Sequence, residues 1–330
     1  MLHRLSHACA AMALLAATPS LAQTPPPDLI PPPPSPPLEV PAAPEPYTSS
    51  GPVILPAQPV SEWRVIPPEN LLVIDTTKGR ILVELAPEIA PLHVDRIRLL
   101  TRGNFYDGLV WHRVIDWFMA QTGDPLGTGE GQSPYPDLTA ELTFRRGPDM
   151  PFAPVARPAG RVSGFFHSLP IESQPDELMP HTGDSRVHGW VAYCSGVAGM
   201  ARDEDPDTAN SQFFFMRQPY PALDKRYTVW GRVVSGLDVV RALKSVDGGD
   251  GIVSDPDRME RVRIASDLPP AEQPVVSILD PGSARFRELA AQVRQARGAD
   301  FSVCDIDLPV HVSDPQNATQ PPATGQQPGL

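Results

Sequence analysis

The sequence predicts a mainly β protein built on an antiparallel β-barrel with α-helices at its ends. After residue 70, apolar residues fall into short runs separated by glycine, proline and other turn formers, which is typical of strands. Only two segments between residues 71 and 265 carry helical spacing, and they do not alternate with the strands as a doubly wound parallel sheet requires. The 330 residues are enough for one large domain with a real core.

Two segments at the start of the chain are expected to lie outside this fold. Residues 1–22 combine Arg4, an apolar run over 8–17 and small residues at 20 and 22, the three-part pattern of a secretory signal peptide. Residues 23–68 are crowded with prolines and predict a disordered linker of polyproline type. We therefore expect an exported, periplasmic protein with no membrane insertion after signal cleavage; an uncleaved anchor is the alternative.

The folded domain is expected to span 69–266 and to open with a hairpin. Two apolar runs, 71–75 and 81–85, flank a turn in which Gly79 supplies the unusual backbone angle. Pro91 stands where a first helical turn tolerates proline, and helical spacing continues to Gly103. Further strands are expected at 109–114, 118–122, 141–144, 197–201, 212–216, 227–234 and 261–265, with a second helix at 237–244.

Two additions surround this core. Residues 145–190 hold many prolines and scattered aromatics, and they predict a long, mostly irregular insertion. Residues 267–330 form an expected C-terminal extension, with a charged amphipathic helix at 283–297 and an unstructured tail rich in Gln and Pro.

Charge and cysteine content limit the possible partners. The formal net charge of −12 argues against nucleic acid and anionic lipid. With the signal peptide removed, Cys194 and Cys304 remain, and they form either one disulfide or two unpaired buried thiols. His181 and His188 lie near Cys194, but their spacing matches no known metal cage, so we expect no metal.

The chemistry-bearing residues gather in two clusters. Residues 111–124 place Arg113 and Gln121 among large apolar side chains, and 210–215 read Asn-Ser-Gln-Phe-Phe-Phe. No nucleophile, metal cage or phosphate loop accompanies them, which predicts chemistry that breaks no covalent bond. Because neighbouring strand residues face opposite ways, Phe213 is core if Phe214 lines a pocket.

These clusters resemble the motifs of the cyclophilin-type peptidyl-prolyl cis/trans isomerases. The likeness runs from about residue 71 to 265, apart from the insertion. It rests on several motifs in the family's order: His112–Ile115, Phe118–Asp124, Gly127–Gly129, Gly199–Arg202, Asn210–Phe214, Leu223-Asp224 and Thr228–Val233. The resemblance implies a closed, eight-stranded antiparallel barrel capped by two helices, isomerase activity (EC 5.2.1.8), and no cofactor or metal.

The resemblance also implies roles for individual residues. Arg113 would be the catalytic arginine, which lysine should not replace, and Gln121 would hold the backbone of the bound peptide. The remaining implied residues line the proline pocket or the peptide groove: Phe118, Met119, Phe214, Leu223 and Tyr227 at the pocket, and Gly127, Ala201, Arg202 and Gln212 along the groove. The blander alternative for each is a surface, core or backbone-satisfying role.

Two positions depart from the family pattern. Ala222 replaces the tryptophan that many eukaryotic members carry, and Tyr227 stands in place of a histidine, so we expect weak cyclosporin binding. The resemblance implies that the 145–190 insertion falls where the family has a brief connection, beside a secondary pocket that senses residues preceding the proline. It either folds over the groove and narrows substrate choice or forms a surface excursion remote from it.

The sequence therefore predicts an isomerase of X-Pro bonds that acts on proline-containing polypeptides during the folding of exported proteins. The alternative is a non-catalytic chaperone module that binds proline peptides in the same groove, with the insertion and the C-terminal helix docking a partner. Retention of Arg113 favours the enzyme, since holding a peptide does not need that donor. We expect a monomer.

Overall fold

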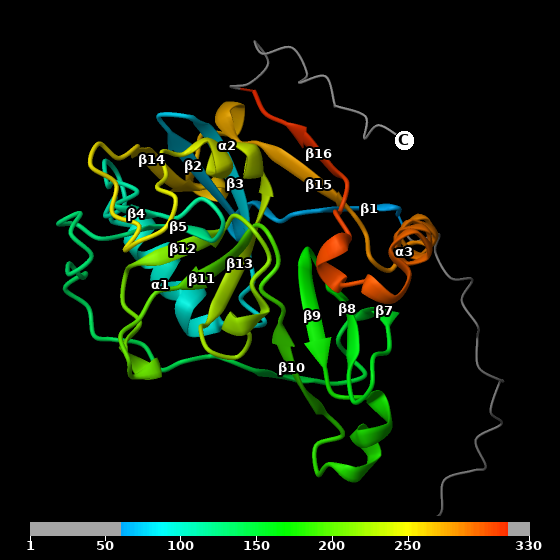
Figure 1. Ribbon diagram of the computed structural model, residues 1–330. Helices are drawn as coiled ribbons and strands as arrows, with labels where there is room; N and C mark the ends of the chain where they lie inside the picture. Colours follow the sequence, from blue (N-terminus) through cyan, green and yellow to red (C-terminus); the bar gives the residue numbers. More distant parts are fainter. Residues whose placement is uncertain (1–60, 316–330) are drawn as a thin grey trace, which may run out of the picture. The chain divides into compact units, whose positions relative to one another are not determined.

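The computed structural model describes residues 61–315, which belong to one compact unit, Ala57–Leu330 (Figure 1). The expected signal peptide, most of the expected linker and the expected tail lie outside these residues. Three antiparallel sheets of eight, five and three strands make up the described chain, so the mainly β prediction is confirmed. No helix within 61–315 is both long and apolar enough to cross a membrane.

The eight-stranded sheet curls into a half-barrel with the order β14-β2-β3-β13-β11-β12-β5-β4 (Figure 1). Its strands are β2 (Leu71–Thr76), β3 (Gly79–Leu85), β4 (Arg113–Val114), β5 (Met119–Thr122), β11 (Val197–Met200), β12 (Phe213–Met216), β13 (Val229–Ser235) and β14 (Met259–Ile264). The expected hairpin is present as β2 and β3, with Gly79 at a φ of +131°.

The expected closed barrel is not observed, because β14 and β4 form the two edges and do not pair as strands. Isolated bridges join this region instead, Val110 to Arg258 and Arg113 to Ile252. The chain beside β4 contains glycines at 248, 249 and 251, all with positive φ. A segment that turns at three such positions cannot stay extended long enough to form a ladder.

Two α-helices accompany this sheet. Helix α1 (Pro91–Arg102) begins at the expected proline and contacts β13 and β14. Helix α2 (Leu237–Ala242) packs against β3 and is shorter than expected. Eight short 3-10 helices complete the described chain: η1 (Pro68–Asn70), η2 (Asp176–His181), η3 (Pro206–Thr208), η4 (Pro221–Leu223), η5 (Ala265–Asp267), η6 (Pro270–Glu272), η7 (Gly298–Asp300) and η8 (Val303–Asp305).

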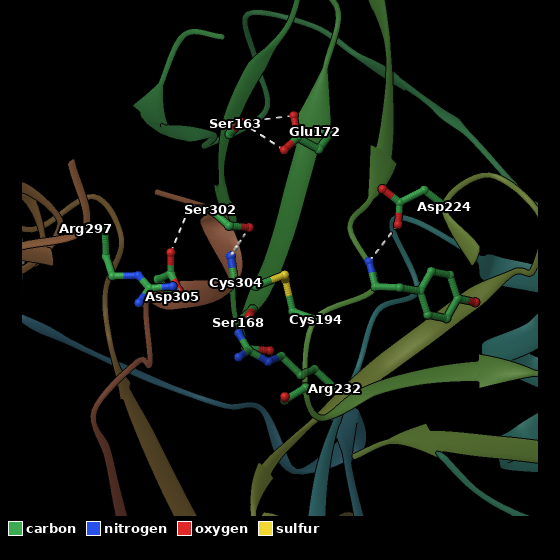
Figure 2. Close-up of a disulfide and its surroundings, with 12 residues drawn as sticks. Ser163, Ser168, Glu172, Cys194, Asp224, Arg232, Arg297, Ser302, Cys304 and Asp305 are labelled. Atoms are coloured by element: carbon green, nitrogen blue, oxygen red, sulfur yellow. Dashed lines mark hydrogen bonds and ion pairs between the residues drawn. A yellow bond between two sulfur atoms is a disulfide. The ribbon is translucent and has the colours of Figure 1, made fainter. Parts of the chain in front are cut away.

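Two strands of the C-terminal extension form a small sheet with one strand from ahead of the core, in the order β1-β15-β16. Its strands are β1 (Trp63–Val65), β15 (Val275–Leu279) and β16 (Val310–Ser313), and helix α3 (Ala284–Arg297) begins after Ser283, whose hydroxyl accepts from Phe286 N. Strand β1 falls inside the expected linker, so the folded chain begins earlier than expected. Cys194 and Cys304 form a disulfide across a separation of 110 residues, which decides between the two alternatives (Figure 2).

The insertion is not irregular, because it folds into a five-stranded antiparallel sheet with the order β6-β10-β9-β8-β7. Its strands are β6 (Phe144–Arg146), β7 (Ala153–Ala156), β8 (Val162–Phe166), β9 (Leu169–Ser173) and β10 (Val187–Val191). Every residue of β8 and β9 is buried, and a tight turn with His167 at a φ of +53° joins them. Pro154 lies on the edge strand β7, where a missing N–H costs little, so prolines were a poor guide here.

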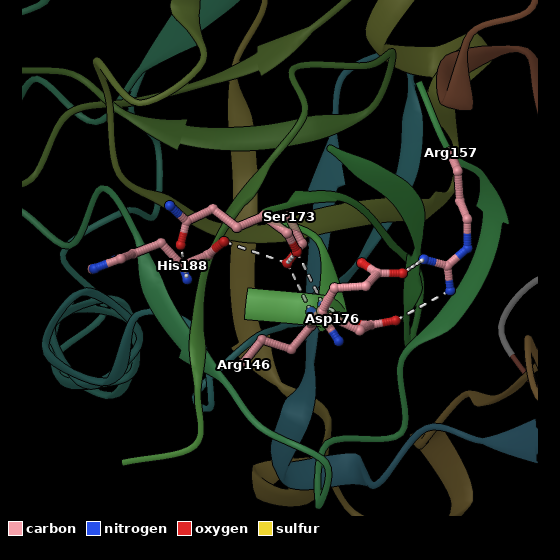
Figure 3. Close-up of polar contacts among 7 residues, drawn as sticks. Arg146, Arg157, Ser173, Asp176 and His188 are labelled. Carbon is pink, nitrogen blue, oxygen red and sulfur yellow. Dashed lines mark hydrogen bonds and ion pairs between the residues drawn. The ribbon is translucent and has the colours of Figure 1, made fainter. Parts of the chain in front are cut away.

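A buried arginine ties this sheet together (Figure 3). Arg146 Nε donates to Ser173 Oγ at 2.8 Å, and its guanidinium pairs with Asp176. Asp176 also pairs with Arg157 at 3.2 Å, while Ser173 Oγ donates to the carbonyl of His188 at 3.3 Å. These contacts connect β6, β9, β10 and η2, which explains why a segment rich in prolines still holds one arrangement.

Candidate functional site

Arg113 lies on the edge strand β4, directly opposite Gln121 on β5. Its Nη1 donates to Gln121 Oε1 at 3.1 Å, and its Nε donates to the carbonyl of Asp250 at 2.7 Å. Partial burial lowers the pKa of Arg113, while the nearby Tyr227 and Asp250 act in the opposite direction. The guanidinium is thus held in one orientation by two bonds and remains a cation at neutral pH.

A chain of amide hydrogen bonds continues from Arg113 across the sheet. Gln121 Nε2 donates to Gln212 Oε1 at 2.9 Å. Gln212 Nε2 in turn donates to the carbonyls of Gly129 at 2.8 Å and Gly131 at 3.0 Å. The structure therefore brings together Arg113, Gln121 and Gln212, and it links them to the glycine-rich loop.

An apolar group lies beside this polar row. Met119 is 1% exposed and its Sδ lies 4.0 Å from Arg113 Nη1. The Phe214 ring meets the Tyr227 ring edge-on, with centroids 5.8 Å apart. Phe118 and Leu223, which are partly buried, pack in the same cluster. All five side chains expected at the proline pocket therefore belong to one group.

The neighbouring phenylalanines of β12 separate as expected. Phe213 is fully buried in the main core, where its ring contacts those of Tyr106, Trp111 and Trp230. Phe214 points the other way and stacks on Tyr193. The alternation of side chains along a strand accounts for this division, and the prediction that Phe213 is core is confirmed.

A cavity of about 110 Å³ lies next to the amide row. It is lined by Gln121, Gly129, Glu130, Gln132, Ala201, Arg202, Asp203, Thr208, Asn210 and Gln212. Three of the expected groove residues, Ala201, Arg202 and Gln212, lie here. Gly127 belongs to the same loop but is not among the lining residues, and a Cβ there would come within 3.0 Å of Val110 Cγ2.

Arg202 joins two loops at the rim of this cavity. Its Nη1 donates to the carbonyls of Asp203 and Glu204, and its Nη2 donates to the carbonyl of Arg226. The guanidinium also lies over the Tyr227 ring, 4.4 Å from the centroid. Arg202 therefore orders the wall around Tyr227 as well as lining the groove.

Asp124 holds the glycine-rich loop in place, a role that the sequence analysis did not assign to it. It is 1% exposed, and its carboxylate accepts from the backbone N–H groups of Leu126 at 2.6 Å, Thr128 at 2.8 Å and Gly129 at 2.6 Å. Burial alone would raise the pKa of Asp124, but these backbone bonds outweigh burial and lower it. An aspartate just before a glycine-rich loop is the signal that could have identified it.

The insertion contributes no residue to the cavity beside Gln212. It instead reaches the back of the loop that carries Leu223 and Tyr227, since Lys225 Nζ lies 4.6 Å from the Trp190 ring centroid. This contact fits neither of the two expected arrangements of the insertion, the lid over the groove and the remote surface excursion. It indicates instead that the insertion supports the pocket wall from behind.

A second cavity, of about 430 Å³, lies apart from the expected site residues. It opens between β7 and α3 and is lined by residues such as Phe152, Phe286 and Arg294. Among residues 61–315, no group of three or more His, Cys, Asp or Glu side chains is arranged to hold a metal ion.

Comparison with known proteins adds independent findings. The sequence model of the family described as cyclophilin type peptidyl-prolyl cis-trans isomerase/CLD matches residues 71–266. A probable peptidyl-prolyl cis-trans isomerase of Brucella suis is 33% identical over 212 residues, which cover 61% of this chain and 85% of that protein. The peptidyl-prolyl cis-trans isomerase ppi1 of Schizosaccharomyces pombe is 32% identical over 170 residues, covering 52% and 82%.

A solved structure extends the likeness to the fold. The crystal structure of cyclophilin AquaCyp293 from Hirschia baltica is 35% identical and superposes with a TM-score of 0.70. The match covers 76% of this chain and 94% of that one, so it reaches beyond residues 71–266.

Proposed function

This chain belongs to the cyclophilin-type peptidyl-prolyl cis-trans isomerases (EC 5.2.1.8), and we propose that it uses Arg113 to accelerate X-Pro rotation in exported proteins during their folding. The observation that carries this proposal is the fixed Arg113 guanidinium beside the apolar group of Phe118, Met119 and Phe214. One side of the site therefore presents a guanidinium held in a fixed orientation, and the other side presents apolar side chains.

The chemistry required is loss of amide resonance. Rotation about an X-Pro bond has a barrier of roughly 18–20 kcal/mol, because the twisted bond loses its partial double-bond character. In that twisted state the proline nitrogen becomes pyramidal and gains a lone pair that can accept a hydrogen bond. A donor aimed at this nitrogen stabilises the twisted state and not the planar one, which is the condition for a faster reaction.

Arg113 has the donors for this task. Its Nε and Nη1 hold it to Asp250 and Gln121, whereas its Nη2 makes no hydrogen bond to any side chain or backbone group between residues 61 and 315. No reorganisation of the guanidinium is needed before it donates. A lysine in this position would lack the planar guanidinium fork. It could not make the two anchoring hydrogen bonds and at the same time donate to the proline nitrogen.

Arg113 alone does not account for the rate. One charge-assisted hydrogen bond contributes about 1.5–3 kcal/mol. The apolar group around Met119 and Phe214 removes water from the amide, which favours the less polar twisted form. Gln121 is placed to hold the peptide backbone, so that only one side of the bond turns. We infer that these three effects act together.

Export and client class follow from other features. The signal-like residues 1–22 and the Cys194–Cys304 disulfide both support an oxidising compartment such as the periplasm. The clients are then proline-containing polypeptides that fold after export.

The test is a proline-isomerisation assay on the wild-type protein and an Arg113→Ala variant, with Asp95→Asn as a surface control. Asp95 lies on helix α1, pairs with Arg98 at 3.3 Å, and its side chain is 75% exposed. We expect catalysis in the wild type and in Asp95→Asn, and its loss in Arg113→Ala. Wild-type rates equal to buffer, with peptide binding retained, would instead support the non-catalytic binding module.

A further inference from the structure

The loop that forms the outer wall of the pocket, residues 220–227, is held by one residue, Tyr193, through its backbone and its hydroxyl. Tyr193 accepts at its carbonyl from Tyr220 N at 2.8 Å, and its own N–H donates to Asp224 Oδ1 at 2.9 Å. Its hydroxyl donates to the carbonyl of Tyr227 at 3.1 Å. Three hydrogen bonds from a single residue thus fix the start, the middle and the end of the wall.

The same residue supports the pocket floor. The Tyr193 ring is 1% exposed and stacks on the Phe214 ring, with centroids 6.0 Å apart and 21° between planes. Burial raises the pKa of the Tyr193 phenol well above its usual range, so the hydroxyl stays protonated and remains a donor. The floor at Phe214 and the wall at Tyr227 therefore both rest on Tyr193.

Gly199 on β11 leaves the space that this arrangement needs. A Cβ at position 199 would lie 2.5 Å from Phe214 Cζ and 2.6 Å from Tyr193 Oη. Both contacts are closer than packed atoms tolerate. The Tyr193–Phe214 pair is thus accommodated by the sheet itself.

The residue after Tyr193 carries the disulfide. Cys194 is buried and is bonded to Cys304 in η8 of the C-terminal extension (Figure 2). That short helix is itself fixed, because Ser302 Oγ accepts from Cys304 N and Ser302 N donates to Asp305 Oδ2. Asp305 also pairs with Arg297 at 3.1 Å, which ties η8 to the end of α3. Movement at Tyr193 is therefore resisted by the whole extension.

We propose that Tyr193 is a positioning residue for the isomerase pocket and that the Cys194–Cys304 disulfide holds it there, so that the C-terminal extension sets how tightly the pocket closes on proline. The proposal rests on the proposed function for the role of the pocket. It assigns a catalytic consequence to a part of the chain outside residues 71–266.

Two variants test it, with KM and kcat measured separately beside the Kd of an X-Pro peptide. Tyr193→Phe keeps the ring and removes only the donor to Tyr227. We expect KM and Kd to rise about fivefold, the effect of one ordinary hydrogen bond, with kcat nearly unchanged. Cys304→Ser, which opens the disulfide, should raise both in the same direction.

The control is Tyr106→Phe. Tyr106 is also fully buried, and its hydroxyl likewise donates to one backbone carbonyl, that of Ser211, at 3.2 Å. The Tyr106→Phe variant should be less stable than the wild type but should not show the rise in KM that is expected for Tyr193→Phe. An equal rise in KM for Tyr106→Phe would reduce the Tyr193 effect to general destabilisation and overturn the proposal.

The double variant Tyr193→Phe/Cys304→Ser separates the two steps. Because both changes act through the same wall, its KM should rise by less than the product of the single effects. Independent, multiplying effects would contradict the claim that the disulfide works through Tyr193. Unchanged KM and Kd in both single variants would refute this inference, and an inactive Arg113→Ala variant in the same assay would leave the proposed function standing. An inactive wild type would refute the proposed function. The Kd values of the single variants would then still decide this inference.

Discussion

Replacing Asp124 with asparagine should destabilise the glycine-rich loop and weaken peptide binding. The Asp124 carboxylate accepts from Leu126 N at one oxygen and from Thr128 N and Gly129 N at the other. An asparagine keeps one oxygen acceptor and puts an NH2 group in place of the second. With the amide oxygen turned toward Thr128 N and Gly129 N, one bond to a charged acceptor is lost, at about 1.5 kcal/mol, and the other two become bonds to a neutral acceptor, each weaker by about 0.75 kcal/mol. The expected cost is therefore about 3 kcal/mol of unfolding free energy.

The effect should depend on pH in a defined direction. The pKa of Asp124 is lowered in the folded protein, so the folded state binds its proton less readily than the unfolded chain, where the value is about 3.9. The stabilisation is then complete above that value and is lost as pH falls through the lower, folded pKa. The difference between wild type and Asp124→Asn should be constant from about pH 7 to 5 and shrink below about pH 4.

Urea denaturation at pH 7, 5 and 3 measures this difference, and a peptide titration measures the effect on binding. Binding should weaken because Gln212 is held by the carbonyls of Gly129 and Gly131, whose loop Asp124 orders. Asp95→Asn, which removes one partner of the exposed Asp95–Arg98 pair on α1, should leave both measurements unchanged. A variant as stable as wild type at pH 7, or a difference that persists undiminished at pH 3, would refute the reasoning.

Two further changes have definite expected results. Burial raises the pKa of Glu172, although Ser163 and Arg161 oppose this, so its ionisation costs stability as pH rises through the interval between the unfolded and folded pKa. Thermal melts at pH 4.5 and pH 7 should therefore show that the Tm of Glu172→Gln, relative to that of the wild type, is higher at pH 7 than at pH 4.5. A Tm difference that does not grow with pH contradicts this. Ala222→Trp should lower the Kd for cyclosporin about tenfold, because the added apolar contact contributes about 1.4 kcal/mol. An unchanged Kd in isothermal titration calorimetry would exclude this effect.

The sequence predicted the local parts of the site well, because strand pairing carries them. Arg113 and Gln121 are close in sequence and meet across β4 and β5, and the alternation of β12 separates Phe213 from Phe214. Helix α1 begins at Pro91, where the missing N–H has no helical partner to lose.

What was not predicted depends on contacts between distant segments. The insertion was expected to be irregular, yet β8 and β9 are completely buried, because they pack with the extension as part of one apolar cluster. The barrel was expected to close, but the glycines after α2 bend the chain beside β4, so that only isolated bridges form there in place of a ladder. Tyr193 carried no motif, since its partners lie at 214, 220, 224 and 227, and only the folded chain brings them together.

The central claim is that Arg113 stabilises the twisted X-Pro bond and not merely the bound peptide. NMR exchange spectroscopy of a saturating X-Pro peptide measures cis–trans interconversion on the protein directly, for wild type and Arg113→Ala at equal bound fractions. The account predicts that the variant still binds the peptide through Gln121 and the pocket but interconverts it at nearly the uncatalysed rate. Equal interconversion rates on the two proteins would contradict it.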